Sequence, residues 1–480
     1  MNIALIMLLV YMAATITISI IMTRKARNKD SSSFLAANNS LGIMLIIPLL
    51  FSEMIAGAGT IGNAASAYSS GINAVWANWG MVIGCFLFII FTLTFYRAMH
   101  RKYGVISIPE AYKFLFDEKC RMVLLIVIAL VYAILFSLQP TAAAAIIAPL
   151  LGASETLVTW IICAIFILVT IGGGMSGVAW MNVLHAVVMY IGMFVVCFLS
   201  IKEAGGIENM QQVLPDSYFS LTGGNTFTTI ANALGTGISF LASATVVTVA
   251  FASKSLKTAR IGTSLAAIIV VPFALFVALI GMAAKVVLPD IAPNTALFSM
   301  ANSLSGVLGG VAAMAIIAAI WSTGPALLMV VATTLTRDLF LKLKPDADDK
   351  KQIRFSRCML VVVGVAGTAF GMTADSILNQ MYGAFQIRSI VGIVLMVAIL
   401  WPRVTKIAAF WSMLVGGIVA AVWFFAGNPF NIAALWPAAG ICLVLLVIIS
   451  FAGKEKESEG HRQYREALQY LKEVEDQQKL

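Results

Sequence analysis

The chain has little charge for its length. Asp, Glu, Lys and Arg make up 11% of its 480 residues, whereas 60% are hydrophobic. Soluble domains contain about 25% charged residues, so a water-soluble protein of this composition would expose far too much apolar surface. The apolar residues form continuous runs of about 20 residues, as membrane-spanning helices require, and lack the short alternating segments of a membrane barrel. The sequence therefore predicts an all-α integral membrane protein.

Residues that build metal and redox sites are scarce and scattered. The six cysteines show no CxxC or paired spacing, and the three histidines lie far apart. This pattern argues against a disulfide framework and against a transition-metal site. No GxxxxGK[ST] nucleotide-binding motif occurs, so we expect neither an enzyme nor an ATP-driven pump. The net charge of +9 does not indicate nucleic-acid binding, because the basic residues lie between apolar runs.

Thirteen apolar runs are long enough to span a membrane. The first, residues 2–23, is followed by a basic cluster and not preceded by one, so it reads as a retained helix and not as a secretory signal. The other twelve are predicted at 41–67, 73–97, 121–150, 156–174, 179–201, 226–252, 260–288, 304–336, 356–373, 376–400, 405–426 and 431–452.

The basic residues predict how these helices are oriented. With the N-terminus outside, 28 of the 31 Lys and Arg residues fall in cytoplasmic segments, as the positive-inside rule requires. The exceptions are Lys202, Lys285 and Arg388. We therefore expect a multi-pass protein of the plasma (inner) membrane, surrounded by lipid bilayer, as a monomer or weak homo-oligomer. Residues 1–453 would form the transmembrane domain and 454–480 a solvated cytoplasmic tail helix.

Two predicted spans contain several glycines. The second contains Gly57, Gly59 and Gly62, and the seventh contains Gly235 and Gly237. A glycine destabilises a helix interior by about 1 kcal/mol, and backbone carbonyls freed by unwinding need a partner inside a membrane. An ion or a solute is such a partner. Two broken helices five crossings apart are typical of an inverted five-helix repeat; alternatively, the glycines only permit close helix packing.

Three segments resemble those of a known transporter family. They are GGMSGVAWMNVLHAVVMYIG (173–192), AAMAIIAAIWSTGPALLMVVATTLTRDLF (312–340) and WPRVTKIAAFWSMLVGGIVA (401–420). Their order and spacing resemble the sodium:solute symporter family, which includes transporters of proline, pantothenate, sugars and sialic acid. The resemblance implies a leucine-transporter-type fold: a 5+5 inverted-repeat core, with one helix before it and two after it. It also implies sodium-coupled symport of a small solute, with Na⁺ as coupling ion and no other cofactor.

The resemblance further implies a sodium site between the break of the second helix and the ninth helix. The ligands carried over are the backbone oxygens of Ser52, Ile55 and Ala319 and the hydroxyls of Ser322 and Thr323. Their chemistry fits, because sodium is a hard cation that takes oxygen ligands, and the A-x-x-S-T spacing places its three residues on one helical face. The alternative is that both hydroxyls only bond to the preceding turn of their own helix.

A second sodium site of the kind found in some family members is not expected. Those members have an Asp two residues after the Trp of the sixth helix, where this chain has Asn182 after Trp180. They also have hydroxyls one turn beyond the A-x-x-S-T, where this chain continues with Gly324, Pro325 and Ala326. We therefore expect a single coupling ion.

Two charged residues lie well inside predicted spans, Glu53 and Arg388. A charge at mid-membrane costs roughly 2.5–3.5 kcal/mol, so each is a candidate functional group. Arg388 would bind a solute carboxylate, since Arg forms bidentate pairs with carboxylates. Otherwise it would pair with Glu53 or cap backbone carbonyls. Glu53 would tune ion affinity, carry a proton, meet an amine, or pair within the protein.

Further polar groups near the predicted breaks are candidates for the solute site. Gln139 precedes Pro140, which loosens its helix. The others are Ser239, Phe240, Ser243 and Gln386. The function predicted from the sequence is sodium-coupled uptake of a small, carboxylate-bearing solute by alternating access. The rivals are a proton-coupled symporter that uses Glu53, and a transporter-shaped sensor or channel.

Overall fold

The computed structural model describes residues 3–26, 41–172, 175–373, 376–453 and 456–477. These residues form an all-helical protein, as predicted, and their only β-pairing is an isolated bridge between Leu41 and Ser253. The α-helices are α1 (Ile3–Ala26), α3 (Ile43–Gly57), α4 (Asn63–Ser70), α5 (Trp76–Leu87), α6 (Leu93–Tyr103), α7 (Ile108–Leu115), α8 (Glu118–Leu151), α9 (Glu155–Gly172), α10 (Met175–Glu203), α11 (Gly206–Val213), α12 (Thr226–Ser239), α13 (Ala244–Ala252), α14 (Leu256–Val287), α15 (Ala296–Leu304), α16 (Gly306–Thr334), α17 (Leu341–Leu343), α18 (Asp349–Gly371), α19 (Ile377–Leu400), α20 (Lys406–Phe425), α21 (Leu435–Ala452) and α22 (Glu459–Gln477).

Shorter helical turns connect or interrupt these helices. Three are π-helical: η1 (Ala58–Gly62), η3 (Phe88–Thr92) and η7 (Leu335–Phe340). Five are 3₁₀-helical: η2 (Ile72–Val75), η4 (Asp216–Phe219), η5 (Phe240–Ala242), η6 (Pro293–Thr295) and η8 (Pro429–Asn431).

The described residues contain ten or eleven helical segments that could be membrane crossings, compared with the thirteen predicted. Ten helical segments are long and apolar enough to cross a membrane, and the pair α12–α13, bent by 43°, makes eleven. Two shorter apolar helices, Ile3–Thr15 and Glu155–Ile171, occupy the first and fifth predicted spans. They are parts of α1 and α9 and are not among the ten or eleven. The number thirteen is therefore not confirmed and stays a prediction.

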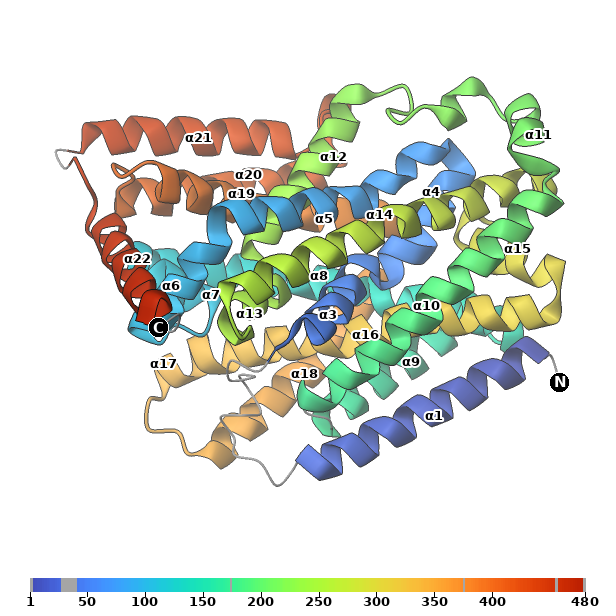
Figure 1. The fold of residues 1–480 in the computed structure, drawn as a ribbon, viewed down its shortest axis with the longest axis horizontal. Coiled ribbons are helices and arrows are strands. Elements are labelled where there is room, and N and C mark those ends of the chain that lie inside the picture. The colour runs from blue at the N-terminus through green and yellow to red at the C-terminus, as the bar shows by residue number, and fades with distance from the viewer. Residues whose placement is uncertain (1–2, 27–40, 173–174, 374–375, 454–455, 478–480) are drawn as a thin grey trace.

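Most of the long helices run roughly along the same axis (Figure 1). Helix α1 lies along one flank, where it packs against α10 and α16, and α20 and α21 pack together on the opposite flank. Between them, α8, α16 and α19 form the interior and are largely buried, while α18 and α21 expose most of their surface. The interior helices bring together the residues that the sequence singled out.

The second predicted span is broken, but not at a glycine. Inside α3, Ala56 has φ 27° and ψ −176°, a conformation that is strained for a residue with a Cβ. The π-helical turn η1 follows. Gly59 lies in that turn because there is no space for a larger residue: a Cβ on it would lie 2.5 Å from Asn78 Nδ2.

The seventh predicted span is also broken, though the prediction that its glycines mark the break is wrong. Helix α12 continues through Gly235 and Gly237, and the chain leaves the helix only at η5 and at Ser243, which is extended. The glycines serve close packing instead. A Cβ on Gly237 would lie 3.1 Å from the carbonyl oxygen of Gly80 in α5.

The C-terminal helix α22 is not the fully solvated helix that the sequence predicted. One of its faces packs against α6 and α7. Tyr464 is buried there against Phe95, and Lys102 forms an ion pair with Glu466 at 3.2 Å. The prediction was based on the alternating charges along α22. It did not use Tyr464, Ala467 and Leu471, which share one face of the helix and are buried.

Candidate functional site

Four of the five predicted sodium ligands meet at the junction of α3 and α16. Thr323 Oγ1 lies 3.1 Å from the carbonyl oxygen of Ser52 and 3.0 Å from that of Ala319. Ser322 Oγ donates to the same Ala319 oxygen at 2.8 Å and lies 3.3 Å from Thr323 Oγ1. Ile55 is buried directly before the break at Ala56, although no hydrogen bond joins it to the other four. The junction thus gathers carbonyl and hydroxyl oxygens in a buried place.

The contact between Thr323 and Ser52 distinguishes a sodium-binding role of the Ser322 and Thr323 hydroxyls from simple back-bonding within α16. Both hydroxyls bond to the preceding turn of α16, as back-bonding alone would produce. Thr323 also donates to a carbonyl on another helix, which back-bonding does not explain. Each hydroxyl oxygen keeps acceptor lone pairs while it donates, so these contacts orient oxygen atoms towards the same space.

Side-chain amides from two other helices form hydrogen bonds with backbone groups at the break of α3. Asn78 Nδ2 donates to the carbonyl oxygen of Met54 at 2.8 Å, and Asn63 Nδ2 donates to Asn78 Oδ1 at 2.9 Å. From α8, Gln139 Oε1 accepts from the Gly57 amide at 3.2 Å. These contacts replace the backbone bonds that the break removes, as a membrane interior requires.

Gln139 therefore has a different setting from the one predicted. Its Nε2 donates to the carbonyl oxygen of Leu135 at 3.1 Å, so both ends of its amide bond to backbone. Asn63 and Asn78 were missed by the sequence analysis. The signal that would have found them is an uncharged amide inside an apolar span, which needs an internal partner.

Arg388 is fully buried in α19 and only partly hydrogen-bonded. Its Nε donates to Ser239 Oγ at 2.6 Å. The guanidinium lies over the rings of Tyr132 and Phe385, 5.4 Å and 5.1 Å from their centroids. Both terminal nitrogens lack a hydrogen-bond partner in the described residues. A buried donor without a partner costs about 1–3 kcal/mol, and more when it is charged, so the site is suited to an anionic ligand.

Glu53 lies at the meeting point of the two broken helices, linked to Tyr132 through Ser243. Its Oε1 accepts a hydrogen bond from Ser243, and its Oε2 is buried without a partner in the described residues. Ser243 Oγ also lies 3.4 Å from the Tyr132 hydroxyl. No ion pair joins Glu53 to Arg388 in the part of the chain that the structure describes. The predicted alternative of a direct pair is therefore not realised.

The remaining predicted residues divide into two groups. Phe240 packs edge-on against Phe385, with ring centroids 6.5 Å apart. Since Phe385 also lies under the Arg388 guanidinium, Phe240 is part of the surroundings of Arg388. Gln386 is not: its Nε2 donates to Asn232 Oδ1 at 3.0 Å, and its Oε1 accepts from the Leu435 amide at 3.3 Å. Gln386 thus ties α19 to α12 and to the start of α21.

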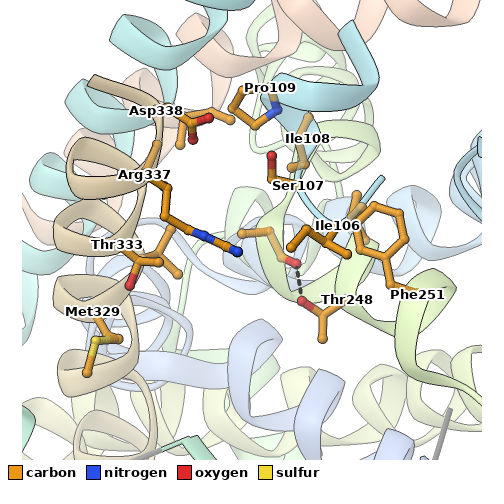
Figure 2. A pocket seen from close by; sticks show the side chains of 15 residues that line it. Ile106, Ser107, Ile108, Pro109, Thr248, Phe251, Met329, Thr333, Arg337 and Asp338 are labelled. Atoms are coloured by element: carbon orange, nitrogen blue, oxygen red, sulfur yellow. Dashed lines mark hydrogen bonds between the residues drawn. The ribbon is translucent and has the colours of Figure 1, made fainter. Parts of the chain in front are cut away.

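Two cavities lie at opposite ends of the α5–α6 span. One, of about 140 Å³, opens between the start of α7, α13 and η7, and reaches Ala244, next to Ser243 (Figure 2). The other, of about 200 Å³, is lined by hydroxyl and amide side chains of α4 and α12 and by Tyr382. The broken helices lie between these cavities, as expected for a binding site reached from either side of a membrane.

Similar structures show the same fold. A sodium-coupled sialic acid symporter in a substrate-bound outward-open state superposes with a TM-score of 0.74 at 16% identity, over 95% of this chain and 98% of that one. MhsT in complex with L-phenylalanine gives a TM-score of 0.56 at 12% identity, over 86% and 99%. The leucine-transporter-type fold is thereby confirmed.

Sequence relatives and the family profile agree with the fold. The sodium/proline symporter of Escherichia coli is 23% identical over 95% of this chain and 95% of its own length. The high-affinity proline transporter PutP of Bacillus subtilis is 22% identical over 88% of this chain and 93% of its own. The profile of the sodium:solute symporter family matches residues 34–416. The chain therefore belongs to the sodium:solute symporter family, whose members are sodium-coupled membrane transporters and not enzymes.

Proposed function

We propose that this protein couples one Na⁺ to the uptake of a small carboxylate-bearing solute by alternating access. The observation that carries the sodium part is the hydrogen bond from Thr323 on α16 to the Ser52 carbonyl on α3. Ser52, Ile55, Ala319, Ser322 and Thr323 would supply the oxygen ligands. The ion would bridge α3 to α16 and hold α3 in its broken shape.

The energy available from one sodium ion is sufficient for accumulation. One charge moving through about 100 mV contributes about 2.3 kcal/mol, and a tenfold sodium gradient adds about 1.4 kcal/mol. Together they sustain roughly a 500-fold solute gradient. Release of sodium on the inner side would let α3 relax and the solute leave.

Arg388 supports a solute that carries a carboxylate. Ser239 and the ring of Tyr132 fix the guanidinium, and its two terminal nitrogens have the spacing to bind a carboxylate in a bidentate pair. Proline, sialic acid and phenylalanine, which appear in the names of the relatives and solved structures, all carry one. Gln139 and Gln386 would shape the site indirectly, through the helices they join.

The orientation is part of the proposal. The N-terminus would lie outside and the C-terminus in the cytoplasm, so the cavity at α7 would open inwards. The protein would reside in the plasma membrane as a monomer or weak homo-oligomer.

One observation favours a proton-coupled alternative. Within the described residues, Glu53 Oε2 is buried without a partner, and a carboxyl group inside a membrane span is a candidate for a proton relay. In this version Glu53 takes over the role of sodium.

Thermal stability of the purified protein distinguishes the two. A panel of carboxylates, amino acids, vitamins and sugars is tested in sodium and in potassium buffer, since a ligand of the folded state raises its stability by mass action. We expect a carboxylate-bearing compound to stabilise the protein in sodium only. Equal stabilisation in both buffers, varying with pH, would contradict sodium coupling and support proton coupling.

A further inference from the structure

The cavity at α7 contains a cation, and the adjacent Asp338 is paired with a different arginine, Arg121. Arg337, in η7, extends from its helix into the cavity towards Ile106 and Thr248 (Figure 2). No hydrogen bond or ion pair is formed by Arg337 within the described residues. Its charge is therefore available to a ligand.

The two carboxylates at the cavity, Asp338 and Glu110, already have partners within the described residues. Asp338, in the same lining, is bound by Arg121 at 2.6 Å. Glu110 accepts from the Ile106 amide at 3.0 Å, and its own amide donates to Ser107 Oγ at 3.2 Å. The first turn of α7 is thus capped from within the chain, and Arg337 is left as the anion-binding group of the lining.

The rest of the lining is mainly apolar. Val247, Phe251, Met329 and Val330 belong to this apolar part of the lining. A small anion with a short apolar tail would fit both the charge of Arg337 and the apolar lining, because its carbon atoms would be buried away from water. A compact inorganic anion would use only the charge.

We propose that this cavity is a second carboxylate site, on the path by which the solute leaves the protein. The cavity reaches Ala244, whose amide donates to the Tyr132 hydroxyl at 2.7 Å, and Tyr132 lies under Arg388. A carboxylate released from Arg388 would next meet Arg337. The identification of this ligand with the solute rests on the proposed function; the binding of a short monocarboxylate does not.

The test uses the purified full-length protein in sodium-free potassium buffer at constant ionic strength. Thermal stability is measured with butyrate, acetate, inorganic phosphate or chloride. We expect butyrate to raise the melting temperature more than acetate, and phosphate no more than chloride. The rise is expected to shrink in Arg337→Gln and to survive in Arg337→Lys. In the Arg388→Gln background, where the central carboxylate site is removed, adding Arg337→Gln is expected to abolish the rise that remains. Arg337 is exposed, so both of its variants should fold.

Two results would overturn the inference, and a third would separate it from the proposed function. A butyrate effect that persists in Arg337→Gln but disappears in Arg388→Gln would place the carboxylate at the central site alone. Equal stabilisation by phosphate and butyrate would show that the anion's charge alone causes the effect and that the apolar lining does not contribute to binding. Failure of the sodium-dependent panel, together with an Arg337-dependent butyrate effect, would remove the proposed function and leave this site standing.

Discussion

One hydroxyl group connects the two helices of the candidate sodium site. Thr323 Oγ1 lies within 3.1 Å of carbonyl oxygens on both α3 and α16. Thr323→Val keeps the shape of the side chain and removes this oxygen. We take the loss of one oxygen ligand of the ion to cost as much as the loss of a hydrogen bond to a charged group, about 1.5–3 kcal/mol. Sodium affinity should then fall roughly 10- to 150-fold.

Sodium titration of the melting temperature checks this expectation. Thr323→Ser, which retains the hydroxyl, is the matched control and should bind sodium nearly as well as the wild type. If the valine variant responds to sodium as the wild type does, Thr323 is not a ligand.

Arg388 tests the solute side of the account. Loss of one partner of a buried, hydrogen-bonded charge pair costs at least about 2 kcal/mol, so Arg388→Gln should weaken solute binding by roughly 30-fold or more. Arg388→Lys should also bind poorly, because an ammonium cannot form the bidentate pair. Sodium alone should still stabilise both variants. Solute affinity close to wild type in Arg388→Gln, measured by thermal shift, would exclude the carboxylate role.

Individual residues were predictable from the sequence only where their chemistry was conspicuous. Glu53 and Arg388 are charges inside apolar runs, and Ser322 and Thr323 follow a family pattern. Gln139 and Gln386 were rightly noticed as polar, but their partners are backbone groups and Asn232. The partners Gly57 and Asn232 lie far away in sequence, so only the packing of the helices reveals them.

At the scale of elements, the break of α3 depends on neighbouring helices. Ala favours helix, so nothing in its own segment marks Ala56 as the point of rupture. The break is held by amides of Asn78 and Gln139, from α5 and α8. The glycines indicated which two spans break, but in both spans the break lies at other residues and follows from tertiary contacts.

Gly59→Ala tests whether this arrangement matters for ion binding. The added Cβ would lie 2.5 Å from Asn78 Nδ2 and 2.9 Å from the Met54 carbonyl oxygen, so Asn78 must move away from the break. We expect a melting temperature several degrees lower and weaker sodium binding. Gly440→Ala in α21, where nothing lies within 4 Å of the new Cβ, should leave both unchanged. Normal sodium binding in Gly59→Ala would show that the break does not depend on Asn78.

At the scale of the whole molecule, two polar contacts join the first predicted five-helix repeat (41–201) to the second (226–400) at places that bear on transport. In the centre, Ser243 at the break of α12–α13 donates to Glu53 of α3. At the end near α7, Arg121 of α8 pairs with Asp338 of η7 at 2.6 Å. Alternating access requires the halves to separate at each end in turn, so the second contact is suited to hold that end closed.

Arg121→Gln should therefore change both stability and conformation. Loss of a charged hydrogen bond costs about 1.5–3 kcal/mol, and the freed end should open more often. We expect faster labelling of a cysteine introduced at Thr248, in the cavity lining, than in the parent with the same cysteine. The control is Lys113→Gln, because Lys113 pairs only at 3.7 Å with Glu118 on an exposed surface. Unchanged labelling in Arg121→Gln would contradict a gating role.

Sodium coupling is the central claim, and solute uptake into proteoliposomes tests it most directly. The solute is the compound that stabilises the purified protein in sodium, and the imposed gradient is either sodium or pH. The account predicts accumulation with an inward sodium gradient and an inside-negative potential, and none with a pH gradient in potassium alone. Accumulation driven by the pH gradient without sodium, and lost in Glu53→Gln, would contradict it.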